Sequence, residues 1–226
     1  MRPLPLERVH LGLMLALTFT TGINDAVGYL GLDKVFTGNM TGNVVVLGMA
    51  LAGGSGLPVL GPALALVGYV VGAAIGGRAM RYAGTGWTRP VTAGFGAVSV
   101  IMLALGTLLL VLDDPSHDVM VAVTTSAAVA MGLQATTARH VAVSDVTTVV
   151  VTSTLTGLAA DPFRGTHLPR AVRRFAAIAF ILVGALVGAL LLKVTLGLGL
   201  VVAGTIIALV TIAGGLIGTA DQQPAQ

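Results

Sequence analysis

The sequence has little charge, few aromatic residues and no cysteine. Of its 226 residues, 9% are charged and 4% are aromatic. A soluble domain carries roughly 25% charged residues, and the mean hydropathy here is +0.96, which excludes a soluble globular, disordered or coiled-coil chain. Without cysteine there is no disulfide, thiolate metal site or cysteine nucleophile. The scarcity of aromatic residues argues against a surface that stacks nucleobases, so no nucleic-acid partner is expected.

Long apolar runs are what the sequence does contain, with 55% of the residues hydrophobic. A helix that spans a bilayer needs about 20 mostly apolar residues. The sequence therefore predicts an all-α, polytopic membrane protein with the lipid bilayer as its main partner. The six runs that reach this length are Val9–Leu32, Leu57–Gly77, Val91–Leu112, Val119–Ala138, Phe175–Leu192 and Val194–Gly218.

Two further apolar segments, Met40–Gly53 and Val146–Ala160, are shorter and rich in Gly, Thr or Asn. If both re-enter without crossing and the N-terminus is cytoplasmic, all ten arginines face the cytoplasm and only Lys34 and Lys193 lie outside. If all eight segments cross, the positive residues divide six against six. The positive-inside rule therefore favours six spans, two re-entrant or broken helices and cytoplasmic termini. The alternative is a seven-span chain with an external N-terminus, in which only the second short segment re-enters. In that arrangement nine positive residues lie inside and three lie outside.

Small and polar residues recur in the same order in the two halves of the chain. Three features keep that order at spacings of 110 to 116 residues, although chance agreement is the alternative in a chain this rich in small residues. Each half would hold three full spans, so the second would be inverted relative to the first, as in many transporters. We expect two inverted repeats, residues 1–112 and 113–226, within one membrane domain. The matched features are Gly22-Ile23-Asn24 with Gly132-Leu133-Gln134, Thr37–Gly42 with Thr152–Gly157, and Gly68/Gly72 with Gly184/Gly188.

Asp25 is the only acidic residue within a long apolar run, and Ala135 occupies the matching position in the second half. A carboxylate at membrane depth is costly, so it normally faces the protein interior or a water-filled cavity. Asp25 is therefore a candidate proton-exchanging group. The alternatives are that it lies near the outer headgroups or that it caps the backbone of the first short segment.

Threonine, asparagine and glycine are concentrated where the two short segments begin. If a helix starts inside the membrane there, its free N–H groups and positive dipole end form a binding site for an anion or a polar oxygen. Alternatively, these side chains only cap the break and hold helices together. The candidate solute-binding residues are Asn24, Asp25, Tyr29, Thr37, Asn39, Thr41, Asn43, Gln134, Thr148, Thr152 and Thr156.

The run Asp25-Ala26-Val27-Gly28-Tyr29, followed by Phe36 and Asn39–Asn43, resembles the YoaK-like family of bacterial integral membrane proteins. The second half carries a similar pattern from Gly132-Leu133-Gln134 to Thr156-Gly157. The resemblance implies a multi-pass protein of the bacterial cytoplasmic membrane. It implies no substrate or mechanism, because the family is known mainly as a domain of unknown function.

These features favour a small secondary transporter or channel for a small polar or anionic solute, proton-linked through Asp25. A non-transporting membrane scaffold or assembly factor is the alternative, held together by its glycine-rich helix faces. Those faces are candidates for a homodimer contact, or equally for packing within the chain. We expect no enzyme and no cofactor, because metalloprotease, serine-hydrolase and P-loop motifs are missing and none of the four histidines pairs with a second ligand.

The charge distribution predicts that both chain termini are cytoplasmic. Reporter fusions at residue 1 and at residue 226 are expected to give the cytoplasmic signal in both cases, because the arginines flank the spans on that side. An external N-terminus would instead favour the seven-span arrangement.

Overall fold

The computed structural model describes residues 6–141, 152, 155–156, 159 and 168–221. Within these residues the chain forms seven α-helices, and six of them are long and apolar enough to cross a membrane. The prediction of an all-α, polytopic membrane protein is confirmed. Most of the second short segment, Val146–Ala160, lies outside the described residues. The helices are α1 Leu6–Gly31, α2 Met40–Leu51, α3 Leu60–Met80, α4 Arg89–Val111, α5 His117–Val141, α7 Leu168–Leu192 and α8 Leu198–Asp221.

The predicted spans agree with the helices except around α7 and α8. Helix α7 begins at Leu168 rather than Phe175, because it continues beyond the apolar run into a basic stretch, where Arg173 forms a 2.6 Å ion pair with Glu7 of α1. Helix α8 begins at Leu198 rather than Val194, after a tight turn. Apolar composition alone marks the membrane-embedded part of a helix, not its polar extension or its first residue.

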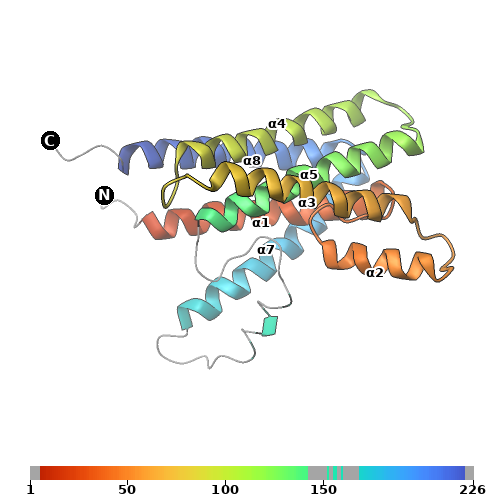
Figure 1. The fold of residues 1–226 in the computed structure, drawn as a ribbon, viewed down its shortest axis with the longest axis horizontal. Coiled ribbons are helices and arrows are strands. Elements are labelled where there is room, and N and C mark those ends of the chain that lie inside the picture. Colours follow the sequence, from red (N-terminus) through yellow and green to blue (C-terminus); the bar gives the residue numbers. More distant parts are fainter. Residues whose placement is uncertain (1–5, 142–151, 153–154, 157–158, 160–167, 222–226) are drawn as a thin grey trace.

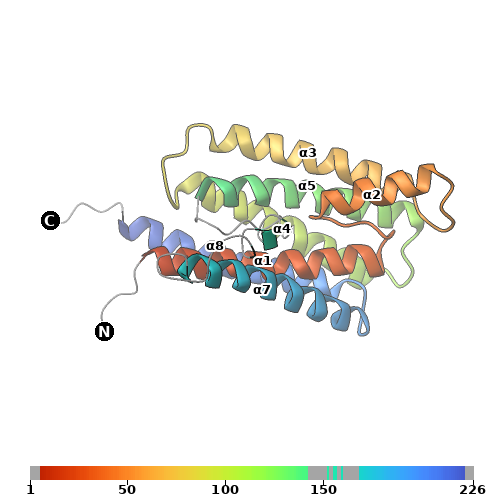
Figure 2. The same ribbon diagram turned by 90° about the horizontal axis from the view of Figure 1, so that it is seen from below.

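The helices form one elongated bundle whose two chain termini lie at the same end (Figure 1). Lys34 and Lys193 lie at the opposite end, where the end of α1 meets the end of α7: Leu30, Gly31 and Lys193 line one shallow hollow there. Helix α2 lies toward this second end, beside α3 (Figure 2). The bundle therefore has one arginine-rich end and one end with the two lysines.

Glycines bring the helices into close contact in two parallel pairs, α1 with α7 and α3 with α5. A Cβ atom on Gly184 of α7 would overlap the carbonyl oxygen of Phe19 in α1, and one on Gly72 of α3 would overlap that of Val129 in α5. Gly22 and Gly132 make the converse contacts, with backbone atoms of α7 and α3. Each glycine contact in one pair thus has a counterpart in the other. The structural equivalent of Gly184 is Gly72, four residues later than the sequence alignment placed it.

The remaining helix contacts also match between the two halves of the chain. Helix α1 also packs on α8, α5 also packs on α4, and α4 packs along α8. Gly68, Gly72 and Gly76 are buried against α5 within the chain. A homodimer contact through the glycines of α3 or α7 would therefore have to displace α5 or α1.

The glycine contacts predict a stability difference between two Gly→Ala variants. Gly72→Ala should lower stability by about 1–3 kcal/mol, because the added methyl group meets backbone that cannot move aside. Gly12→Ala is the matched control, since Gly12 has nothing within 4 Å of its Cβ position, and there alanine should be neutral or stabilising by up to about 1 kcal/mol. Thermal unfolding in detergent measures both. Equal melting temperatures for the two variants would contradict the close contact.

Candidate functional site

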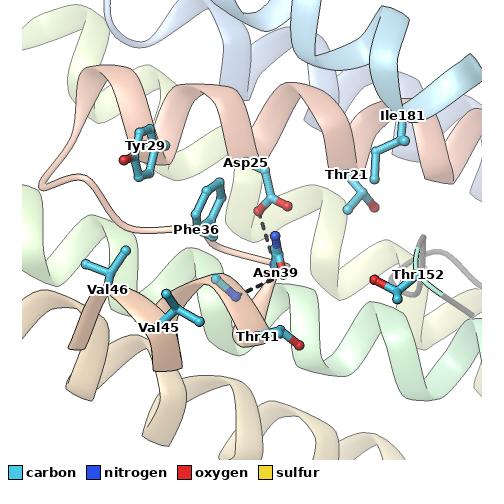
Figure 3. A pocket seen from close by; sticks show the side chains of 11 residues that line it. Thr21, Asp25, Tyr29, Phe36, Asn39, Thr41, Val45, Val46, Thr152 and Ile181 are labelled. Carbon is cyan, nitrogen blue, oxygen red and sulfur yellow. Dashed lines mark hydrogen bonds between the residues drawn. The ribbon is translucent and has the colours of Figure 1, made fainter. Parts of the chain in front are cut away.

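An open cavity of about 660 Å³ lies between α1, the start of α2 and α7, and some of its lining residues, such as Thr41 and Val45, are exposed. Its lining combines one carboxylate, several hydroxyl groups and an amide with apolar side chains (Figure 3). Such a mixture, a few polar groups in an apolar wall, is typical of a small-molecule site. The lining residues are Thr21, Asp25, Tyr29, Phe36, Asn39, Thr41, Gly42, Val45, Val46, Thr152 and Ile181.

Asp25 connects α1 to the N-terminus of α2. Its Oδ1 atom accepts hydrogen bonds from the backbone N–H of Gly38 at 2.7 Å and of Asn39 at 3.4 Å, and from the Thr37 hydroxyl at 3.4 Å. A carboxylate at a helix N-terminus satisfies free N–H groups and interacts favourably with the helix dipole. The capping alternative for Asp25 is therefore realised in the structure. Its side chain also lines the cavity, so capping does not withdraw it from the site.

The segment between α1 and α2 is held by side chains of its own. The Asn43 amide accepts a hydrogen bond from Phe36 N at 2.8 Å and donates one to Phe36 O at 2.7 Å. The Phe36 ring stacks on Tyr29 with 4.7 Å between the ring centroids. Asn39 is the N-cap of α2 and accepts a hydrogen bond from Gly42 N. These contacts fix where α2 begins and therefore where its N–H groups point.

Helix α2 begins inside the bundle and ends toward the lysine end. Its start lies level with Asp25, while at the bundle end Lys34 Nζ, which precedes the helix, donates to Gly56 O, which follows it, at 2.7 Å. Its 12 residues correspond to about 18 Å at 1.5 Å per residue. A bilayer core is about 30 Å thick. Helix α2 is therefore too short to cross it.

The structure divides the predicted site residues into three groups. Those that line the cavity are Asp25, Tyr29, Asn39, Thr41 and Thr152. Those that do not line it are Asn24, Thr37, Asn43 and Gln134, all fully buried, and Thr156, whose hydroxyl donates to Thr152 O at 3.0 Å. Thr148 lies outside the described residues.

Six lining residues were not among the predicted site residues: Thr21, Phe36, Gly42, Val45, Val46 and Ile181. Thr21 precedes Asp25 by four residues and so lies on the same face of α1; this spacing could have identified it. Phe36 and Ile181 carry no such signal, because their contribution depends on how α2 and α7 pack. Within the described part of the chain, no group of three His, Cys, Asp or Glu side chains could hold a metal ion.

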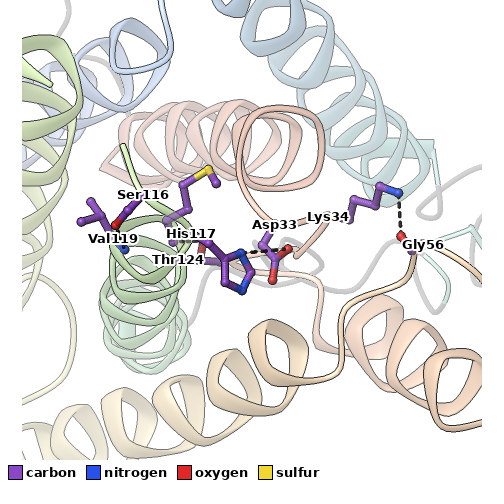
Figure 4. A network of polar contacts seen from close by, with 8 residues as sticks. Asp33, Lys34, Gly56, Ser116, His117, Val119 and Thr124 are labelled. Carbon is purple, nitrogen blue, oxygen red and sulfur yellow. Dashed lines mark hydrogen bonds and ion pairs between the residues drawn. The ribbon is translucent and has the colours of Figure 1, made fainter. Parts of the chain in front are cut away.

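A second polar network lies at the lysine end, outside the spans. Asp33, in the loop after α1, pairs with His117 at the start of α5 at 3.9 Å (Figure 4). Asp33 Oδ2 is buried without a hydrogen-bond partner, against the first turn of α3 at Gly61. Burial raises the pKa of Asp33 above its ordinary value of 3.8, and the charges of His117 and Lys34 partly offset this rise. Asp33 thus attaches the loop that leads into α2 to two neighbouring helices.

The comparisons with known proteins agree with the sequence resemblance. A family model described as "Protein of unknown function (DUF1275)" matches residues 13–213. The UPF0700 transmembrane protein YoaK of Bacillus subtilis (strain 168) is 32% identical over 188 residues, which cover 79% of this chain and 82% of the relative. No solved structure matches.

The raised pKa of Asp33 predicts a pH-dependent difference between wild type and Asp33→Asn. Because the folded state favours the protonated carboxyl, the contribution of Asp33 to stability is fully present below pH 3.8 and is lost as the pH rises through the raised value. The melting temperature of Asp33→Asn minus that of wild type should therefore increase as the pH rises from 3.8 through the raised pKa of Asp33, and should be constant above it.

His117→Gln tests the same argument from the other side. His117 lowers the pKa of Asp33, so its removal should shift the pH window of the Asp33→Asn effect upward. Melting curves of the single and double variants across pH measure this. A difference that does not change with pH would contradict the burial of the Asp33 carboxyl.

Proposed function

This chain belongs to the DUF1275 family of membrane proteins, and we propose that it is a small secondary transporter or channel whose solute binds in the Asp25 cavity. The observation that carries the proposal is a carboxylate that lines a cavity among membrane-spanning helices. A charged group at membrane depth is costly and is normally retained for function. Polar groups from α1, α2 and Thr152 converge on the same space (Figure 3).

The charge of the site favours a neutral or cationic polar solute over an anionic one. The N–H groups at the start of α2 would suit an anion, but the Asp25 carboxylate lies beside them, where it accepts hydrogen bonds from the backbone N–H of the N-cap residue Asn39 and of Gly38 before it. No lysine or arginine is among the described lining residues. An anion would therefore meet the negative charge of Asp25 without a compensating positive side chain. Hydroxyl groups and amide groups suit a solute with several hydrogen-bonding groups.

The architecture supports alternating access between two inverted repeats. The pair α1–α7 corresponds to α5–α3, and α1–α8 corresponds to α5–α4, so the packing is reciprocal between the halves. In transporters built from inverted repeats, substrate sites lie between the repeats and include broken helices. We infer that α2 re-enters the membrane from the side of the lysine end, and that both termini are cytoplasmic.

Proton linkage follows from the contacts of Asp25. The ionised carboxylate makes charge-assisted hydrogen bonds to the start of α2, and these are roughly twice as strong as neutral ones. Protonation would weaken them and release the N-terminus of α2 from α1. Proton binding would thereby be coupled to the position of the helix that forms one wall of the cavity.

A non-transporting scaffold is the second candidate, and it is favoured by the capping role of Asp25 and by the glycine contacts inside the bundle. In that case the carboxylate and the threonines would only satisfy backbone groups. We infer no enzymatic role for either candidate, because no acid, base and nucleophile converge in the cavity lining. The two candidates differ in whether water and ions reach the cavity.

Charged thiol reagents distinguish the candidates, because the chain has no native cysteine. Thr41→Cys places one thiol in the cavity lining. We expect it to react with membrane-impermeant methanethiosulfonates, and to react roughly fivefold faster with the cationic ethyltrimethylammonium reagent than with the anionic ethylsulfonate, a difference of about 1 kcal/mol. In Thr41→Cys/Asp25→Asn this preference should disappear, because the attracting charge is gone.

Thr137→Cys is the matched control, since Thr137 is a fully buried threonine that does not line the cavity, and it should not react. Intrinsic rates of the reagents on a free thiol are used to correct the ratio. If Thr41→Cys is as unreactive as the control in a folded protein, the cavity is closed to water and the scaffold candidate is favoured.

A further inference from the structure

Helices α1 and α5 cross in antiparallel directions and contact each other through four side chains, of which Thr21 also lines the cavity. Asn24 Nδ2 donates to Met131 Sδ at 3.4 Å, and Gln134 Nε2 donates to Thr21 Oγ1 at 3.3 Å. All four side chains are buried, and Asn24 and Gln134 are completely inaccessible to solvent. We call Thr21, Asn24, Met131 and Gln134 the crossing quartet.

The crossing quartet has a twofold pattern. A spacing of 110 residues relates Thr21 to Met131 and Asn24 to Gln134. The contact from Asn24 to Met131 therefore corresponds to the contact from Gln134 to Thr21. The two amides, at equivalent positions of the two halves, each donate a hydrogen bond across the same helix crossing.

Both amide oxygens of the quartet are buried without a donor. Asn24 Oδ1 and Gln134 Oε1 are two of only four buried side-chain N or O atoms without a hydrogen bond in the described part of the chain. A buried polar atom left without a hydrogen bond loses its hydration without compensation, so two of them at one crossing need a partner. That partner must attract oxygen atoms, which leaves a hydrogen-bond donor or a cation.

The surrounding charge favours a cation. Asp25 Oδ1, Thr21 and Met131 all lie within 3.5 Å of the Cβ position of Gly38, so the carboxylate lies beside the crossing quartet. The buried polar residues of the described bundle are Thr, Ser, Asn and Gln, with no lysine or arginine among them. A small cation is neutralised by this carboxylate, whereas a water molecule leaves the negative charge uncompensated. Amide and carboxylate oxygens are also ligands that hard cations prefer.

We propose that the crossing of α1 and α5 is a binding site for a monovalent cation of the Na⁺ or K⁺ type, with Asn24 Oδ1 and Gln134 Oε1 as ligands from the two halves. Neither amide lines the solute cavity, although Thr21 of the crossing quartet and Asp25 do. The inference stands whether or not the cavity transports a solute. Its test needs no solute and no flux measurement.

Thermal unfolding of the purified full-length protein in NaCl, KCl, LiCl or choline chloride at equal ionic strength tests the site. A ligand that binds only the folded state raises the melting temperature in proportion to the logarithm of its concentration. At concentrations about ten- to a hundredfold above Kd, one alkali cation should raise the melting temperature by about 3–10 °C over choline. Calorimetric titration of the same protein with that chloride salt measures the binding directly.

The variants Asn24→Leu and Gln134→Met replace each amide by an apolar side chain of similar size. Each should lose most of the cation response, while melting in choline at the wild-type temperature or higher, because an unsatisfied oxygen has been removed. Ser99→Ala is the control: it removes a buried hydrogen bond between α4 and α8 and should keep the full response.

Equal melting temperatures of wild type in all four salts would overturn the proposal and indicate that the amides hold a water molecule. A response that persists in the folded Asn24→Leu/Gln134→Met double variant would also overturn it. Labelling of Thr41→Cys is independent of both results, so failure of the cation site and failure of the solute cavity are separate outcomes.

Discussion

The structure depends on how the backbone N–H groups at the start of α2 are satisfied inside a membrane protein. A helix that begins within the bilayer core has no water to accept its first hydrogen bonds, and each unsatisfied group costs several kcal/mol. The Asp25 carboxylate accepts hydrogen bonds from the backbone N–H of the N-cap residue Asn39, from that of Gly38 before it and from the Thr37 hydroxyl. Asn39 Oδ1 accepts one from Gly42 N in the first turn of the helix. The same carboxylate therefore holds the end of the loop against α1, fixes the residue before α2 and places a negative charge beside the cavity. The position of α2 and the charge of the cavity thus both depend on Asp25.

That arrangement requires α1 to be held rigidly, and glycines provide the support. Gly22 and Gly184 allow the backbones of α1 and α7 to touch, and Gly188 does the same one turn farther along. Close contact of small residues is the main source of helix association in lipid, because apolar burial gives no preference for protein over lipid. With α1 fixed, Asp25 stays level with Gly38, and the 2.7 Å hydrogen bond between them becomes possible. Packing at one face of α1 thus positions the charge on another.

The sequence was sufficient to predict the membrane spans, because a run of about twenty apolar residues has one stable arrangement in a bilayer, a helix that crosses it. It was also sufficient to identify Asp25 as unusual, because an acidic residue within an apolar run needs a polar partner or a water-filled cavity. It did not decide between capping and function for Asp25, and the structure shows that the side chain both caps α2 and lines the cavity. Asn43 and Thr37 were predicted to bind solute from their polarity, and in the structure they make hydrogen bonds within the protein, to Phe36 and Asp25. Polarity marks a residue that needs a partner; only packing determines whether that partner is the protein or a solute.

The two halves share a scaffold but not a charge. Asn24 and Gln134 occupy equivalent places, and each donates a hydrogen bond across the α1–α5 crossing, whereas the residue equivalent to Asp25 is Ala135. An alanine cannot accept a hydrogen bond through its side chain or exchange a proton. The cavity is therefore lined by a carboxylate from the first half, and position 135 supplies none. Reciprocal packing allows each half to adopt the conformation of the other. In both arrangements the carboxylate that lines the cavity would come from α1. The asymmetry would then assign proton exchange to one half, while the crossing amides remain common to both.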